Sequence, residues 1–371
     1  MFHEIDQFLD SFLTMEIPGY DFRVLHHGKE VYRRINGFSD IENRIPMNGS
    51  ERYNIYSCSK VFTVCAALQL WEKGLYQLDD LLADYMPEFA EMTVNTPDGI
   101  RPAQNRITIR HLFTMTAGFT YDLYSENLKQ AWADTDGRCP TRETMKYLAE
   151  APLAFEPGTA WNYSLCHDVL AALVEVLSGM KFEEYVRQNI FEPLGMTQST
   201  FLLPVEEYNT VCAQYTDAGQ PTGRKRLELT AFSPTDRYCP YRLGTEYASG
   251  GAGCVSTVED YLRFLEALRK KEGVIKPETI AVMTTPQLPS GMETWLPPNY
   301  AYGLGVRCAM DPVQNGVTDY GWGGAAGAFL AVDPVHDFTF YYAQHVRNST
   351  VQTQRIQLAQ LVRKALSGLN R

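Results

Sequence analysis

The chain has 371 residues, 45 % of them hydrophobic, which suffices for the core of one large domain or of two closely packed ones. Its net charge is −11 and its acidic residues are scattered, so it has neither the basic surface of a nucleic-acid-binding protein nor a polybasic membrane anchor. No apolar run approaches the roughly 20 residues of a membrane span, and the acidic N-terminus lacks the pattern of a secretory signal, so we expect a cytoplasmic protein without nucleic-acid or membrane partners.

The N-terminal part predicts a helix, a hairpin and a second helix. Residues 4–15 place apolar side chains at the spacing of an amphipathic helix. Residues 21–26 and 30–37 predict two strands joined by a turn at residues 27–29. The run 61–71 is apolar nearly all round, which indicates a helix buried on most sides. A helix followed by strands points to an α+β arrangement.

The middle of the chain predicts helices and loops. Residues 107–114 form the pattern of a helix that ends near Gly118, and a second apolar helix over 169–177 ends at Gly179. Residues 199–246 are irregular and rich in Tyr, Pro and Arg. Because this stretch is longer than a simple connection needs, we expect an active-site loop or lid there.

Strand patterns return after this loop. Residues 249–255 are strand-like, and 256–259 form a capping box for the helix that follows. A final amphipathic helix is predicted over 353–366, and further strands are predicted over 302–307, 318–322, 328–332 and 338–343. Strands at both ends predict one sheet domain made of residues 1–56 plus 247–371, with a mainly helical domain over 57–246 inserted.

Several common catalytic and cofactor motifs are missing. The chain has no G-x-S-x-G elbow, no H-E-x-x-H and no glycine-rich loop ending in Lys-Ser or Lys-Thr. The eight cysteines lack C-x-x-C spacing, so we expect reduced thiols and no metal site. Cys58 fits a small packing residue. The sequence therefore predicts a protein without cofactor or metal.

A candidate nucleophile lies where an extended segment gives way to the first buried helix. Here Ser57-Cys58-Ser59-Lys60 would place a hydroxyl and an amine on one helix face. The helix N-terminus would also favour negative charge developing near Ser57. The S-x-x-K pattern arises by chance roughly once in a chain this long, and an N-cap serine is the structural alternative. It recurs at Ser178 and Lys181, beside a glycine helix stop, where we expect no site.

Six ordered segments together resemble one family of serine hydrolases. They are residues 57–60, 107–118, 155–158, 163–164, 250–257 and 322–327. With these segments the chain resembles the group that contains class C β-lactamases, penicillin-binding proteins and family VIII carboxylesterases. The resemblance implies a β-lactamase-like α/β (α+β) fold, in which an antiparallel sheet flanked by helices carries an inserted mainly helical domain. It also implies an active site in the cleft between the two.

The resemblance implies a role for each matching residue. Ser57 would be the nucleophile and Tyr163 the tyrosine of the Y-x-N motif. The Ser57 and Ala325 N–H groups would form the oxyanion hole, and Trp322, Gly323 and Gly324 would bind substrate. Either Lys60 or Tyr163 could take the serine proton, because a nearby ammonium favours a phenolate whereas desolvation favours a neutral amine.

Two departures from the family motifs bear on the substrate. Leu165 stands where the Y-x-N motif has asparagine, and Trp322 stands where lactamases carry the cationic residue of K-T-G or H-T-G. Both changes weaken the case for β-lactam or peptide recognition. His167 is a candidate substrate-binding group that could supply the missing polar contact, although a buried structural histidine is the alternative.

These observations predict an esterase that acylates Ser57 with a small to medium, uncharged ester. Its partner would be a small-molecule ester or amide. The alternatives are an acyltransferase in which a bound alcohol or amine replaces water, a β-lactamase or D-aminopeptidase-type amidase, and a non-catalytic penicillin-binding-like protein.

Overall fold

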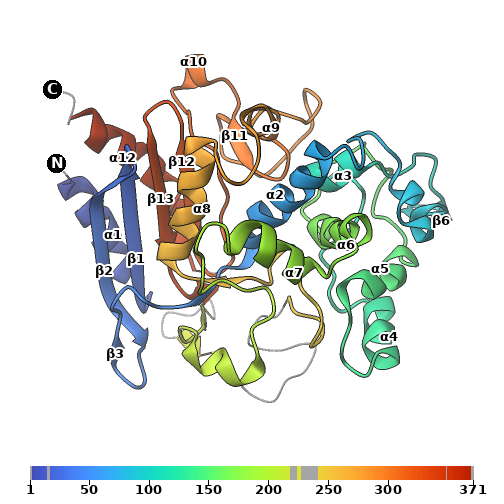
Figure 1. The fold of residues 1–371 in the computed structure, drawn as a ribbon, viewed down its shortest axis with the longest axis horizontal. Helices are drawn as coiled ribbons and strands as arrows, with labels where there is room; N and C mark the ends of the chain where they lie inside the picture. The colour runs from blue at the N-terminus through green and yellow to red at the C-terminus, as the bar shows by residue number, and fades with distance from the viewer. Residues whose placement is uncertain (1, 15–16, 218–223, 227–240, 348, 369–371) are drawn as a thin grey trace.

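The computed structural model describes the whole chain except residues 1, 15–16, 218–223, 227–240, 348 and 369–371. Segments from both ends of the chain build one sheet, in which blue β1 and β2 lie beside red β12 and β13 (Figure 1). All its neighbouring strands are antiparallel. The strands, in spatial order, are β12 (Phe329–Asp333), β13 (Phe338–Ala343), β1 (Gly19–His26), β2 (Lys29–Asp40) and β3 (Ile45–Pro46).

Helices cover both faces of this sheet. Alternating side chains of β12 point to opposite faces, as the period of a strand requires. Phe329 and Ala331 pack with helices α1 (His3–Thr14) and α12 (Gln357–Ser367). Leu330 and Val332 belong to the second, larger core, together with apolar residues of α8 (Val258–Lys270). The sheet therefore joins two hydrophobic cores.

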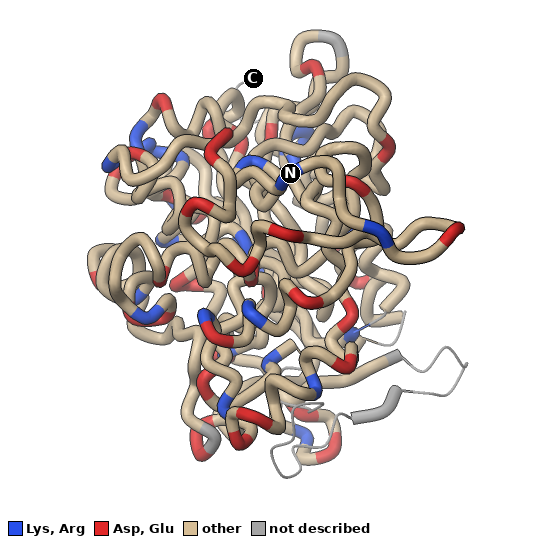
Figure 2. The backbone as a smooth tube through the Cα atoms, turned by 90° about the vertical axis from the view of Figure 1, so that its right-hand side faces the viewer, with Lys and Arg blue, Asp and Glu red and all other residues tan. Residues whose placement is uncertain are grey.

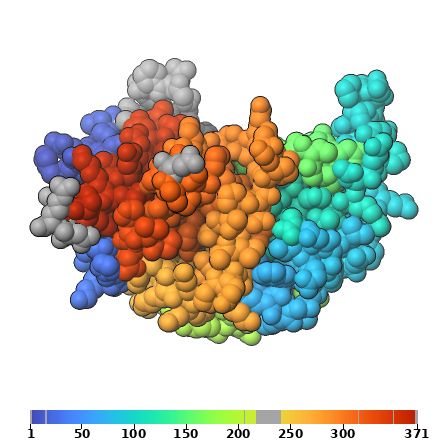
Figure 3. All heavy atoms as spheres, turned by 90° about the horizontal axis from the view of Figure 1, so that it is seen from above, coloured from blue at the N-terminus to red at the C-terminus, as the bar shows by residue number. Residues whose placement is uncertain are grey.

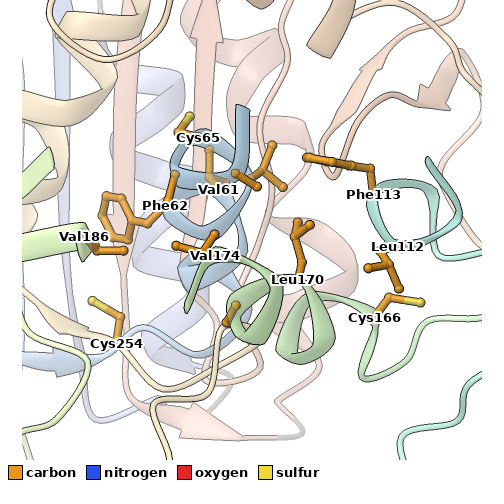
Figure 4. Close-up of a cluster of buried hydrophobic side chains, with 14 of the residues drawn as sticks. Val61, Phe62, Cys65, Leu112, Phe113, Cys166, Leu170, Val174, Val186 and Cys254 are labelled. Atoms are coloured by element: carbon orange, nitrogen blue, oxygen red, sulfur yellow. The ribbon is translucent and has the colours of Figure 1, made fainter. Parts of the chain in front are cut away.

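Helix α2 (Ser59–Glu72) lies at the centre of the larger core, and eleven of its residues are buried. Figure 4 shows Val61 and Phe62 of α2 among side chains from the neighbouring helices, including Leu170 of α6. The other helices of this part of the core are α3 (Ile109–Thr114), α4 (Glu126–Asp134), α5 (Thr141–Ala149), α6 (Cys166–Ser178) and α7 (Phe182–Val186). The predicted N-terminal helix, hairpin and buried helix are confirmed, as is the stop of α6 at Gly179, whose φ is 70°.

Short elements complete the fold. Strand β4 (Tyr53–Asn54) pairs with β9 (Val255–Ser256), which brings the segment before residue 256 beside the turn at Ser57. The other short strands are β5 (Thr93–Thr96), β6 (Gly99–Pro102), β7 (Tyr215–Asp217), β8 (Arg224–Arg226), β10 (Tyr300–Tyr302), β11 (Arg307–Ala309) and β14 (Val346–Arg347). The short helices are η1 (Tyr56–Cys58), η2 (Leu82–Asp84), η3 (Pro87–Phe89), η4 (Arg187–Phe191), η5 (Val205–Thr210), α9 (Pro277–Met283), α10 (Pro312–Asn315) and α11 (Val351–Gln354).

Several predicted elements in the C-terminal part differ in the structure. The strand expected over 318–322 is reduced to isolated bridges, and residues 250–252 of the strand-like stretch 249–255 form a turn before β9. The single strand expected over 302–307 is a tight connection between β10 and β11, because Gly303 N–H bonds to Val306 O at 2.8 Å and Gly305 has a φ of 72°. The cap of α8 is Thr257, whose hydroxyl accepts from Asp260 N–H at 3.0 Å, and not Ser256. The final helix is divided into α11 and α12.

The expected loop over 199–246 lies partly outside the described residues. Its described part contains η5, β7 and β8, and Val346 of β14 pairs with Tyr215 of β7. Seen from above, the blue and red ends of the chain lie together, away from the cyan and green middle of the chain (Figure 3). The domain boundaries at 56 and 247 stay a prediction.

Charged residues of both signs are spread along the backbone tube of Figure 2. Within the described part of the chain, no helix combines the length and the apolar character that crossing a membrane requires.

Candidate active site

Ser57 lies in a strained turn at the start of α2. Tyr56, directly before it, has a φ of 48°, which an L-residue with a large side chain rarely adopts. The short helix η1 continues without a break into α2, so Ser57 is at the N-terminal end of a long helical segment. Strain of this kind concentrates at functional sites. The turn leaves Ser57 partly exposed while Tyr56 and Cys58 on either side are buried.

Lys60 lies one helical turn after Ser57 and is fully buried. Its Nζ is 3.5 Å from Ser57 Oγ and donates to Gly251 O at 2.7 Å. It also lies 3.2 Å from the hydroxyl of Tyr121. Burial lowers the pKa of Lys60 to about 7, although the Asp168 carboxylate opposes the shift. A large share of this amine is therefore neutral at neutral pH and able to accept a proton.

Tyr163 comes from the turn before α6 and faces Lys60 and Ser57. The Lys60 Nζ lies 4.5 Å from the centre of its ring. Burial raises the pKa of the Tyr163 phenol, and hydrogen bonds with Ser57 and Trp322 only partly offset this rise. Trp322 Nε1 donates to the Tyr163 hydroxyl at 3.1 Å. The phenol is therefore protonated at neutral pH and can pass a proton but not begin as a base.

The turn over residues 322–328 approaches the Ser57 turn closely. A Cβ on Gly324 would lie 2.4 Å from Ile55 O, so only glycine fits there without displacing the backbone before the nucleophile. Arg355 fixes the turn by donating to Gly324 O at 2.7 Å and to Ala328 O at 2.8 Å. Ala325 and Ser57 line the same cavity. The predicted oxyanion-hole residues are thus brought together.

Ser57 opens into a cavity of about 310 Å³ whose lining includes six aromatic side chains. Tyr163 and Trp322 stack with their ring centres 5.8 Å apart, and Tyr121 stacks on the other side of Tyr163 at 5.6 Å. Trp295 stands at the rim, where 61 % of its surface is exposed. Such a cavity suits an apolar group next to the reacting serine.

Two arginines, which the sequence analysis did not anticipate, also line the cavity. Arg307 donates to Asp319 at 2.7 Å, which balances its charge. Arg355 is the residue that fixes the 322–328 turn, and burial lowers its pKa to about 10. Within the described residues, no group of three or more His, Cys, Asp or Glu side chains is placed to hold a metal ion.

His167 is not brought to the cavity. Its ring is fully buried, and a Cβ on Gly305 would lie 2.8 Å from Cε1 of the ring. Burial lowers the pKa of the imidazole well below its ordinary value. The expectation that His167 binds substrate does not match this position, because the ring packs inside the core and its neighbour on α6, Asp168, points toward Lys60.

Two side chains near Lys60 were missed in the sequence analysis. Tyr121 follows the 107–118 segment, and no spacing connects it with Lys60. Asp168 did leave a signal, because it is an acidic residue directly before the apolar run 169–174 of α6. By contrast Cys58 is a packing residue as expected, since it is buried and burial raises the pKa of its thiol to about 12.

The sequence model of the family described as Beta-lactamase matches residues 5–363. The chain belongs to the β-lactamase family. This β-lactamase-family protein is a serine hydrolase, and its mixed helices and antiparallel sheet form the β-lactamase-like fold.

Three similar proteins illustrate the range of activities among its relatives. Esterase EstB of Burkholderia gladioli is 32 % identical over 330 residues, covering 84 % of this chain and 81 % of the relative. Acyltransferase calJ of Penicillium decumbens is 28 % identical, covering 87 % and 76 %. The solved structure of EstCE1, described as a hydrolase with promiscuous acyltransferase activity, superposes with a TM-score of 0.78, 26 % identity and 97 % coverage of each chain. The match to esterase EstB agrees with the family VIII resemblance of the motifs.

Proposed function

We propose that this β-lactamase-family protein hydrolyses small to medium, uncharged esters through an acyl-enzyme on Ser57. The proposal rests on the position of Ser57. Its side chain lines the aromatic cavity, and its Oγ lies 3.5 Å from the buried amine of Lys60. At the third motif this cavity presents the indole of Trp322 and no lysine or histidine. The similarity to a protein named an esterase supports the same reaction class.

Lys60 is the general base of the proposed acylation. Its neutral amine takes the Ser57 proton while Oγ bonds to the carbonyl carbon of the ester. Lys60 is preferred over Tyr163 because burial lowers the pKa of the amine to about 7 and raises the pKa of the phenol. The oxyanion that forms accepts hydrogen bonds from the N–H groups of Ser57 and Ala325.

Tyr163 relays the proton to the leaving group. When the tetrahedral intermediate collapses, the bond from carbon to the alcohol oxygen breaks, and that oxygen takes the Tyr163 hydroxyl proton. The Lys60 ammonium restores the phenol proton, so the amine is neutral again. Water then attacks the carbonyl carbon of the acyl-enzyme while Lys60 accepts its proton. The bond from that carbon to Ser57 Oγ breaks, Oγ takes the proton back from the Lys60 ammonium, and the acid leaves.

Hydrolysis of p-nitrophenyl butyrate, followed at 25 °C, tests the proposal. We expect Ser57→Ala to lower kcat by about 1,000-fold or more, because it removes the nucleophile. The matched control is Ser178→Ala in the second S-x-x-K segment, which should leave kcat unchanged. After reaction with a fluorophosphonate, mass spectrometry should find the adduct on Ser57. No hydrolysis by the folded protein, or an adduct on another serine, would contradict the proposal.

Acyl transfer is the second candidate activity. The exposed Trp295 extends the aromatic surface of the cavity outward and offers an alcohol a place to bind beside the acyl-enzyme. Relatives named as acyltransferases point the same way. The test is the ratio of new ester to acid when 2-phenylethanol is added. If the alcohol binds to the acyl-enzyme, the ratio of ester to acid saturates as the alcohol concentration rises. If the ratio rises linearly, the alcohol reacts from solution and a bound acceptor is rejected.

A further inference from the structure

A buried carboxylate lies behind the catalytic amine and has no role in the reaction described so far. Asp168 is in the first turn of α6 and is fully buried. Its Oδ1 accepts from Ser249 Oγ at 2.7 Å and from the Tyr247 hydroxyl at 3.0 Å. Its Oδ2 is also buried and lies against the backbone of Gly251, whose N–H favours the carboxylate. Because a fully buried carboxylate charge is costly even when it accepts hydrogen bonds, this position favours a compensating positive charge nearby.

Lys60 supplies that charge across Gly251 when its amine is protonated. A Cβ on Gly251 would lie 2.5 Å from Asp168 Oδ2 and 3.2 Å from Lys60 Nζ. The same atom would lie 3.0 Å from the Tyr121 hydroxyl. The carboxylate, the amine and the phenol therefore surround one glycine, whose missing side chain leaves the carboxylate open to the amine.

The other titratable groups around this cluster are neutral at neutral pH. Burial raises the pKa of the surrounding phenols and thiols and lowers the pKa of the one imidazole. These groups are Tyr121, Tyr163, Tyr247, Cys58, Cys166 and His167. Burial also raises the pKa of Asp168, but the two hydroxyl donors and Lys60 favour its ionised form. Among the described residues, Asp168 is therefore the carboxylate whose charge acts on Lys60.

We propose that Asp168 is a positioning residue whose negative charge holds the Lys60 amine beside Ser57 and increases its affinity for a proton. Asp168 does not line the cavity, so it acts through Lys60 and not on the substrate. The inference rests on the proposed role of Lys60 as general base. Without the carboxylate, burial alone would act on the amine and leave it a weaker base.

A purely structural role is the alternative, since Asp168 also links α6 to residues 247–249 through its two hydroxyl donors. The two roles differ in what they do to pH dependence. Loss of an anchor lowers activity or stability at every pH. Loss of a charge beside the base moves the acidic limb of the pH profile to lower pH, because the amine then loses its proton more readily.

The test uses Asp168→Asn, which keeps the size of the side chain and an oxygen for the two hydroxyl donors. The rate of Ser57 labelling by a fluorophosphonate and the kcat/KM for p-nitrophenyl butyrate are measured against pH. We expect the acidic limb of both profiles to move down by about 1 pH unit, with a lower plateau. The matched control is Glu175→Gln, because Glu175 is on the same helix, is 9 % exposed and accepts from Phe182 N–H at 3.0 Å, remote from Lys60. The acidic limb of the pH profiles of Glu175→Gln should not move.

A folded Asp168→Asn protein whose limb stays in place would overturn the proposal. If that variant does not fold, the proposal is tested through the effect of Lys60 on the protonation of Asp168. Infrared difference spectra of Lys60→Met against the unchanged protein should show Asp168 gaining its proton at higher pH in the variant, since the amine that favours the carboxylate is lost. An unchanged carboxyl band overturns the proposal. Labelling of Ser57 without ester hydrolysis would reject the proposed function, while the labelling profile would still test Asp168.

Discussion

Trp322 Nε1 donates a hydrogen bond of 3.1 Å to the hydroxyl of Tyr163, although the two residues are 159 positions apart in the chain. Because an indole nitrogen can only donate, the Tyr163 oxygen accepts this bond and keeps its own hydrogen for another partner. Ser57 also hydrogen-bonds with Tyr163, and this bond, like the one from Trp322, lowers the pKa of the phenol. The bond from Trp322 therefore orients the phenol for proton transfer and connects two distant motifs.

Removing only the donor tests this relationship. Trp322→Phe keeps an aromatic wall but loses the N–H group, so Tyr163 is less firmly oriented. We expect kcat for ethyl butyrate, whose alkoxide needs the Tyr163 proton to leave, to fall about fivefold, the equivalent of one ordinary hydrogen bond, while KM changes little. A kcat equal to that of the unchanged protein would show that this bond does not contribute to the reaction.

The pH dependence of hydrolysis reports on the base. The amine must be neutral to accept the Ser57 proton, and burial lowers the pKa of Lys60 to about 7. Above this value most of the amine is neutral, and below it most is protonated. We expect kcat/KM to fall about tenfold for each pH unit on the acidic side. A rate that stays constant from neutral pH down to about pH 5 would rule out Lys60 as the base.

Trp295 is expected to decide how well large apolar groups bind. Its ring is 61 % exposed at the cavity rim and lies 5.4 Å from Trp161 and 5.6 Å from Tyr163, centre to centre. Trp295→Ala should raise KM for a naphthyl ester severalfold and leave KM for a methyl ester and both kcat values nearly unchanged. Trp132, 40 % exposed and not part of the cavity, is the matched control. Equal effects of Trp132→Ala and Trp295→Ala on KM would contradict this role.

Gly324 is expected to be essential for the approach of the 322–328 turn to Ser57. In Gly324→Ala the new Cβ would meet Ile55 O at 2.4 Å, which pushes the predicted oxyanion-hole residues apart. We expect kcat to fall by about 100-fold, comparable to losing one oxyanion donor. Gly368→Ala is the control, because its Cβ would meet nothing closer than Ala365 O at 3.4 Å. Full activity of Gly324→Ala would argue against the turn's role.

The part of the site that could be predicted depended on local spacing or on motifs. Ser57 and Lys60 are three residues apart on one helical segment, so the regular geometry of a helix brings their side chains together. Tyr163 and Trp322 required the family resemblance, because no local rule connects them. The strand expected over 302–307 was wrong because Gly303 and Gly305 form a tight connection whose bonds a strand pattern does not contain.

By itself the sequence predicted the α+β arrangement and the closeness of Ser57 and Lys60 from periodicity and short-range geometry, and its ordered motifs predicted Ser57 as the nucleophile and the β-lactamase-like fold. Only the tertiary structure decided which residue of α6 faces Lys60. Successive residues of a helix point about 100° apart, so a choice between His167 and Asp168 depends on how α6 is rotated against α2. That rotation is set by packing of the whole core, which buried His167 away from the cavity and turned Asp168 toward the amine.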